Sequence, residues 1–276
     1  MKIDSHQHFW KYHPVKDAWI NESMKAIQRD FLPADLRPLL TENHIEGCVA
    51  VQADQTEAET DFLLQLAQNH EFIKGVVGWV DLRADNIAER LAHFAQFPKL
   101  KGFRHIVQAE PEDDFLLRSD FCRGIGLLSA YHFTYDILIF PRHLPYAASF
   151  VARFPEQPFV VDHLAKPDFT STDFSAWEKG IRAIAAFPNV CCKVSGMVTE
   201  ADWKNWKKQD FVYCLDVLAD AFGTDRLMFG SDWPVCLVAA SYGEICDIVQ
   251  DYFAQFPPEA QNKLWGENAV KFYHLT

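Results

Sequence analysis

The segment Lys2-Ile3-Asp4-Ser5-His6-Gln7-His8 is short and has the pattern of a β-strand. His6 and His8 are two residues apart, so in a strand both rings point to the same face, and Asp4 joins them there. Seven further short, β-rich runs follow it along the chain. They are Gly47–Ala53, Lys74–Asp81, Lys101–Ile106, Phe133–Leu138, Pro158–Leu164, Val190–Ser195 and Arg226–Asp232.

Longer segments with helical spacing separate these runs, which is the pattern of repeated βα units. The segments expected to be helical are Glu57–Asn69, Asn86–Phe97, Ser119–Tyr131, Leu144–Phe154, Trp177–Phe187, Phe211–Phe222, Tyr242–Phe253 and a closing helix at Pro257–Leu275. Eight parallel strands are what a closed barrel needs. We therefore predict an α/β fold, a (β/α)8 TIM barrel, with residues 1–276 forming a single domain.

One connection is much longer than the others, a long loop after the first strand that runs from Phe9 to about His44. An insertion at the top of a barrel commonly shapes the substrate pocket. The alternative is a packed loop that only covers the barrel mouth. The sequence leaves both open.

The composition favours a small-molecule substrate. The 276 residues carry a formal net charge of −12 and no run of Lys or Arg, which argues against nucleic acid or an anionic membrane as partner. The N-terminus lacks the apolar segment of a signal peptide, and no stretch approaches the roughly 18 apolar residues of a membrane span. The seven cysteines include no CxxC pair, so we expect reduced thiols and a cytoplasmic protein. The composition is also compatible with a homo-oligomer.

In such barrels the active site lies at the carboxyl ends of the strands. The polar residues expected at those ends are His6, His8, Arg104, His105, Asp136, Asp162, His163, Lys193, Ser195 and Asp232. A buried charge is costly unless it is paired, so a ring of charges indicates mutual pairing around a solvent-filled site. Strand alternation lets only one residue of Arg104–His105 and one of Asp162–His163 face inward, which makes Asp162 and His105 the weaker candidates.

This set of residues supports hydrolysis. His6, His8, His163 and a carboxylate can hold a divalent ion with an open position or, without metal, can polarise a carbonyl by hydrogen bonds. Asp232, at the end of the last strand, is placed to take a proton from water as general base. Arg104 and Lys193 would offer positive charge to an anionic oxygen or to substrate hydroxyls.

With these residues in place, the chain resembles the amidohydrolase superfamily and, within it, the branch of sugar lactonases. The segments that carry the resemblance cover nearly the whole length: residues 4–10, 29–36, 51–53, 78–82, 101–105, 161–167, 193–197 and 228–235. Better known members have Lys or Glu on strand four and His on strand five, where this chain has Arg104 and Asp136. The resemblance therefore implies no two-metal centre, and either no required cofactor or a single, weakly held zinc on His6, His8, Asp232 and His163.

The resemblance implies an enzyme that opens a sugar-acid lactone, such as L-fucono-1,5-lactone or L-rhamnono-1,4-lactone, by water attack on the ester carbonyl. Asp232 is the expected base, His6, His8 and Arg104 stabilise the oxyanion, and His163 orients the substrate or protonates the ring oxygen. The residues expected to bind substrate are Lys193, Asp136, His105, Trp10, Trp79 and Trp233. Two alternatives are a zinc-dependent decarboxylase or hydratase of the same superfamily and a non-catalytic barrel that binds a sugar acid.

Overall fold

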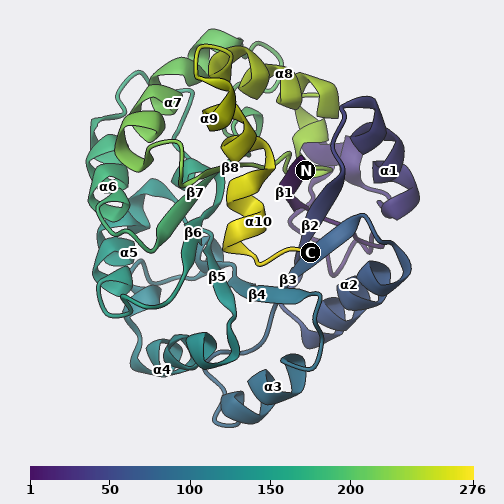
Figure 1. The fold of residues 1–276 in the computed structure, drawn as a ribbon, viewed down its shortest axis with the longest axis vertical. Coiled ribbons are helices and arrows are strands. Elements are labelled where there is room, and N and C mark those ends of the chain that lie inside the picture. Colours follow the sequence, from purple (N-terminus) through teal and green to yellow (C-terminus); the bar gives the residue numbers. More distant parts are fainter.

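The computed structural model describes all 276 residues, and its eight strands form one parallel sheet in the order β1 to β8 (Figure 1). The strands are β1 Ile3–Gln7, β2 Gly47–Val51, β3 Ile73–Gly78, β4 Leu100–His105, β5 Thr134–Ile137, β6 Phe159–Val161, β7 Val190–Val194 and β8 Leu227–Phe229. Just beyond β8, the Asp232 N–H donates to the His6 carbonyl at 2.8 Å and the His8 N–H donates to the Trp233 carbonyl at 2.7 Å. The last strand thus returns to the first, and the predicted (β/α)8 barrel is confirmed.

The helices surround the strands as an outer layer (Figure 1). They are α1 Pro33–Glu42, α2 Glu57–Asn69, α3 Ile87–Phe94, α4 Ser119–Leu128, α5 Leu144–Val151, α6 Ser175–Ala185, α7 Lys208–Phe222, α8 Tyr242–Phe253, α9 Pro258–Asn262 and α10 Asn268–Phe272. The expected helices over 57–69 and 242–253 match α2 and α8 residue for residue.

The expectation of one continuous closing helix at Pro257–Leu275 is wrong. A π-helical turn at Lys263–Glu267 separates α9 from α10, and Gly266 leaves helical geometry there. A Cβ on Gly266 would lie 2.0 Å from the Met1 carbonyl oxygen, so only glycine permits this approach of the two chain ends. The break brings α10 across one end of the barrel.

The long connection after β1 is only partly a loop. It ends in α1, which is the helix of the first βα unit, and it contains a 3-10 segment at Glu22–Ile27. Trp10 and Phe31 exchange two backbone hydrogen bonds, of 3.0 and 2.9 Å, which hold the two ends of the excursion together. The part that precedes α1 therefore spans residues 9–32, and we call it the excursion after β1.

Apolar side chains fill the barrel interior at the amino ends of the strands. Ile3, Val49, Val77 and Met228 form an apolar cluster with Tyr273 that includes residues at the end of the chain. Because α10 and Tyr273 cover this end, a cavity can open only at the carboxyl ends of the strands. A larger cluster of 71 buried residues fills the layer between strands and helices.

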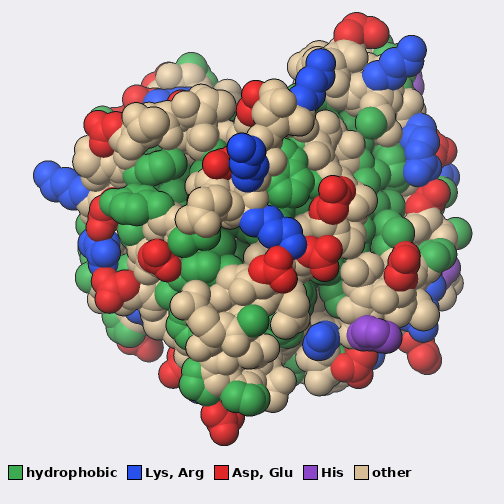
Figure 2. Space-filling model, turned by 90° about the horizontal axis from the view of Figure 1, so that it is seen from above, with side chains coloured by type: hydrophobic (Ala, Val, Ile, Leu, Met, Phe, Trp, Pro, Cys, Tyr) green, Lys and Arg blue, Asp and Glu red, His purple; other side chains and the backbone are tan.

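The face in Figure 2 carries acidic and basic side chains interspersed, with apolar side chains between them. No helix in the structure combines the length and the apolar character that crossing a membrane requires.

Candidate active site

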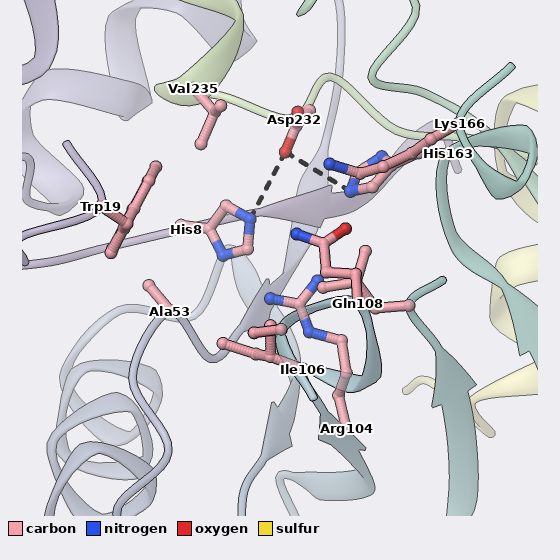
Figure 3. A pocket seen from close by; sticks show the side chains of 12 residues that line it. His8, Trp19, Ala53, Arg104, Ile106, Gln108, His163, Lys166, Asp232 and Val235 are labelled. Carbon is pink, nitrogen blue, oxygen red and sulfur yellow. Dashed lines mark ion pairs between the residues drawn. The ribbon is translucent and has the colours of Figure 1, made fainter. Parts of the chain in front are cut away.

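A cavity of about 290 Å³ opens at the carboxyl ends of the strands (Figure 3). Its volume lies at the lower end of the ~300–1,000 Å³ that small-molecule sites commonly enclose. Half of its lining is apolar and half is polar. The lining residues are His8, Trp19, Ala53, Arg104, Ile106, Gln108, Ala109, Leu138, His163, Lys166, Asp232 and Val235.

Asp232 is the carboxylate of this cavity. Its Oδ1 lies 3.4 Å from His8 Nε2, 3.7 Å from His163 Nε2 and 3.8 Å from His6 Nε2. Burial by itself raises the pKa of Asp232, but the neighbouring His163, His8 and His6 outweigh it and hold that pKa below its usual range. The Asp232 carboxylate is therefore ionised at neutral pH, in a place where three imidazoles converge on one of its oxygens.

The orientation of His8 is set by the backbone of β2. Its Nδ1 lies 2.8 Å from the Val51 carbonyl oxygen, which can only accept a hydrogen bond, so Nδ1 carries the proton. In neutral His8 the lone pair on Nε2 then faces Asp232, and it also lies 3.2 Å from His6 Nε2. A backbone carbonyl on one ring nitrogen and a free lone pair on the other is the usual arrangement of a metal-binding histidine.

His163 reaches the cavity through an uncommon backbone turn. After β6, the residues from His163 to Lys166 all have positive φ, between 53° and 56°. Each such residue with a side chain costs roughly 1–2 kcal/mol, and strain of this kind concentrates at functional sites. The turn is held by Ser195, whose Oγ lies 2.8 Å from His163 Nδ1, and by Gly196, where a Cβ would lie only 2.6 Å from that nitrogen.

The turn also corrects the expectation that only one of Asp162 and His163 faces inward. Strand pairing ends at Val161, so alternation no longer applies and both side chains reach the site. Asp162 Oδ2 accepts from Arg104 Nη1 at 3.0 Å, and Asp162 Oδ1 lies 3.0 Å from Lys193 Nζ and 3.3 Å from His6 Nδ1. The neighbouring cations Lys193 and Arg104, together with His6, outweigh burial and lower the pKa of Asp162 well below its usual value.

Below the cavity lies a fully buried network of charges. Lys193 Nζ lies 2.5 Å from Asp136 Oδ2 and 3.1 Å from His6 Nδ1, and the Tyr273 hydroxyl donates to Asp136 at 2.8 Å. Burial raises the pKa of Asp136 to about 6, against the opposing effect of Lys193. Neither Lys193 nor Asp136 has any exposed area, so both support His6 from beneath instead of lining the cavity.

A family model described as Amidohydrolase matches residues 3–275. This chain belongs to the amidohydrolase family. An L-fucono-1,5-lactonase of Burkholderia multivorans is 43% identical, over 100% of this chain and 96% of the relative, and one of Burkholderia ambifaria is 36% identical, over 99% and 96%. The crystal structure of a Burkholderia multivorans amidohydrolase with bound zinc superposes with a TM-score of 0.97 at 43% identity, covering 100% of both chains.

This amidohydrolase has a donor set that suits one zinc ion. His6 Nε2, His8 Nε2 and Asp232 Oδ1 lie 3.2–3.8 Å apart, and tetrahedral zinc with ligand distances of about 2.0–2.2 Å requires ligand atoms separated by nearly that much. The facing lone pair of His8 and the carboxylate of Asp232 need a positive partner. Arg104 Nη1, 3.3 Å from His6 Nε2, already brings positive charge to this point and would weaken the hold on a metal.

Like Lys193 and Asp136, the other four expected substrate-binding residues lie outside the cavity lining of this amidohydrolase. Trp10 and Trp233 are buried among aromatic residues of the excursion after β1, and the Trp10 indole N–H donates to the Arg29 carbonyl at 2.9 Å. Trp79 donates to His105 Nδ1 at 3.3 Å. The other ring nitrogen of His105 contacts Glu110, and the ring stacks on Phe115, so it faces the helical layer.

Eight of the twelve lining residues were not predicted from the sequence, and three of these carry an aromatic or polar side chain: Trp19, Gln108 and Lys166. Each stands on a connection after a strand, where no periodicity reports the direction of a side chain. Lys166 could have been predicted, because it lies in the segment 161–167 that carries the family resemblance. Gln108 Oε1 is buried at the cavity without a hydrogen-bond partner in the protein, which marks it as a free acceptor.

Proposed function

We propose that this protein is a lactonase that opens a sugar-acid lactone, with L-fucono-1,5-lactone as the first substrate to test, to the corresponding aldonic acid. The observation that carries the proposal is the ionised Asp232 carboxylate inside the cavity, with three imidazoles on one oxygen. The two L-fucono-1,5-lactonases that align over the full length of this chain support the same substrate class.

Asp232 is the general base of the proposed reaction. It takes a proton from a water molecule whose oxygen bonds to the ester carbonyl carbon, which gives a tetrahedral intermediate with a negative oxygen. When this intermediate collapses, the bond between that carbon and the ring oxygen breaks. The proton held on Asp232 passes to the ring oxygen, which becomes a hydroxyl, and the new carboxylic acid ionises.

His163 is the proposed donor to the carbonyl oxygen. Burial lowers its pKa to about 4, so the ring is neutral at pH 7. With the Ser195 hydroxyl donating to Nδ1, the proton of His163 is on Nε2, which faces the cavity beside Asp232. A neutral N–H in this position stabilises the developing oxyanion as a fixed hydrogen-bond donor.

Arg104 adds positive charge at the floor, and its direction is set by its partners. Its Nη1 donates to Asp162, and its Nη2 donates to the Gln52 carbonyl and, at 3.1 Å, to Gln52 Oε1. We assign Asp162, Lys193 and Asp136 to holding Arg104 and His6 in place. Gln108 replaces Lys193 and Asp136 as the proposed partner of a sugar hydroxyl.

We further propose that His6, His8 and Asp232 hold a single zinc ion, while the Nε2–H of His163 stays beside the site as a hydrogen-bond donor. Bound there, zinc supplies Lewis-acid polarisation of the water or of the carbonyl oxygen. The nearby Arg104 makes a weakly held ion the expected outcome.

The test is Asp232→Asn, assayed with L-fucono-1,5-lactone and a panel of other aldonolactones, with and without chelator. Loss of one general base costs about 10²–10⁴-fold, so we expect kcat to fall by at least a hundredfold in the folded variant. Asp168→Asn, which changes an exposed carboxylate beyond the cavity, is the matched control and keeps the parent rate. A folded Asp232→Asn protein with more than a few per cent of the parent rate contradicts the assignment.

A further inference from the structure

Lys166 is a second cation at the cavity, besides Arg104, and has no role in the proposed reaction. It is the last residue of the left-handed turn that begins at His163, and both residues line the same opening. Figure 3 shows Lys166 entering the cavity from the side of His163, across from Trp19. The strained turn thus delivers two polar side chains to one wall.

The two cations of the cavity differ in what their donors do. The guanidinium of Arg104 is turned into the floor, where Asp162 and Gln52 accept from both terminal nitrogens. Lys166 Nζ has one ion-pair partner, Glu200 Oε1 at 3.0 Å, and lies 5.5 Å from the centre of the Phe140 ring. An ammonium has three donors, so two of those on Lys166 are free for a bound molecule.

Hydrolysis creates a need for such a cation. The lactone is neutral, whereas the product carries a carboxylate beside the regenerated carboxylate of Asp232. Two like charges in a cavity of low polarity repel each other strongly unless a cation lies nearby. The groups within 4 Å of Asp232 Oδ1 are the imidazoles of His6, His8 and His163, and no lysine or arginine pairs with this carboxylate.

We propose that Lys166 binds the carboxylate of the sugar-acid product, an inference that rests on the proposed lactonase function. Its ammonium donates to a carboxylate oxygen while Glu200 keeps the Nζ at the cavity wall. Arg104 stays at the floor, held by Asp162 and Gln52. Lys166 is therefore a determinant of product affinity and of the preference for an anionic over a neutral sugar ligand.

The experiment compares a neutral and an anionic ligand in the same protein. The dissociation constant of sodium L-fuconate is measured by calorimetry, and KM is measured for L-fucono-1,5-lactone, in the parent and in Lys166→Gln. We expect the fuconate constant to rise about tenfold or more, because a charge-assisted hydrogen bond is lost, while KM changes less than about threefold. Added NaCl weakens fuconate binding to the parent and has little effect on Lys166→Gln.

Two further variants separate charge from packing. Lys166→Arg keeps the charge and is expected to bind fuconate within about threefold of the parent. Lys179→Gln removes an exposed lysine on the outer helix α6 and leaves both ligands unaffected. An unchanged fuconate constant in Lys166→Gln, or an equal loss for fuconate and lactone, overturns the role of Lys166.

The two proposals fail in different ways. A parent protein that binds fuconate through Lys166 yet opens no sugar lactone contradicts the proposed function. A parent that opens the lactone while Lys166→Gln binds fuconate normally contradicts only the role of Lys166.

Discussion

The Asp4 carboxylate accepts two hydrogen bonds from Ser231, one from its backbone N–H at 2.9 Å and one from its hydroxyl at 2.6 Å. Asp4 belongs to β1 and Ser231 follows β8, so this contact closes the barrel at the residue before Asp232. Asp232 itself has a φ of 57°, in the left-handed region, and depends on its neighbours to stay there.

Ser231→Ala is expected to lower both stability and turnover. Asp4 Oδ2 would keep only the Tyr242 hydroxyl, at 3.0 Å, and a buried acceptor that loses a partner costs about 1–3 kcal/mol. Urea unfolding gives the stability, and kcat for lactone opening reports the placement of Asp232. Ser5→Ala, which removes a 2.6 Å bond to the Phe229 carbonyl in the same region, is the control and should leave kcat unchanged. Equal kcat values for the two variants would contradict the link to Asp232.

Trp19→Ala is expected to raise KM for the lactone about tenfold with little loss of stability. The indole lines the cavity while 43% of the residue is exposed, and its edge-on packing against Trp10 at 5.9 Å sets its direction. An aromatic face contributes about 0.5–1.5 kcal/mol beyond the area that it buries. Val15→Ala, on the same excursion and well exposed, is the control. If Trp79→Phe raises KM and Trp19→Ala does not, the sugar ring packs on Trp79 and the prediction for Trp19 is wrong.

The contact between His105 and Glu110 makes the stability of the folded protein depend on pH. Burial lowers the pKa of His105 below its usual value and outweighs Glu110, whose Oε1 lies 2.6 Å from Nε2. Because the folded state favours the neutral ring, its stability is present above the unfolded pKa of about 6.5 and is lost as the pH falls. The free energy of unfolding should therefore drop more from pH 7 to pH 5 in the parent than in His105→Gln. Parallel urea series for both proteins, with the exposed His93→Gln as control, would reveal identical slopes if this is wrong.

Zinc analysis tests the proposed donor set. The parent, dialysed against zinc, is expected to bind about one ion per chain and to release it to a chelator. His8→Gln should reduce this stoichiometry because it removes the lone pair that faces Asp232. His13→Gln, a change of a histidine outside the donor set, is the control. Undiminished zinc in His8→Gln would place the ion elsewhere, with His6, Asp162 and His163 as the other donor group.

Much of the fold was determined by local sequence patterns. Alternation at Ile3–Gln7 and the apolar runs at β2 to β8 predicted all eight strands, and helical periodicity predicted α2 and α8 to the residue. Such patterns report backbone periodicity, which is a property of neighbouring residues. Because parallel strands in a barrel present their carboxyl ends at one mouth, the sequence also brought His6, His8, Arg104 and Asp232 to a common site.

Only the tertiary structure decided which side chains enter the cavity. The left-handed turn at 163–166 rests on contacts with Ser195 and Gly196, far along the chain, and it turns Asp162, His163 and Lys166 inward against strand alternation. The path of the excursion after β1 likewise brings Trp19 to the cavity and buries Trp10. The directions of these side chains follow from packing between distant segments, which no local period encodes.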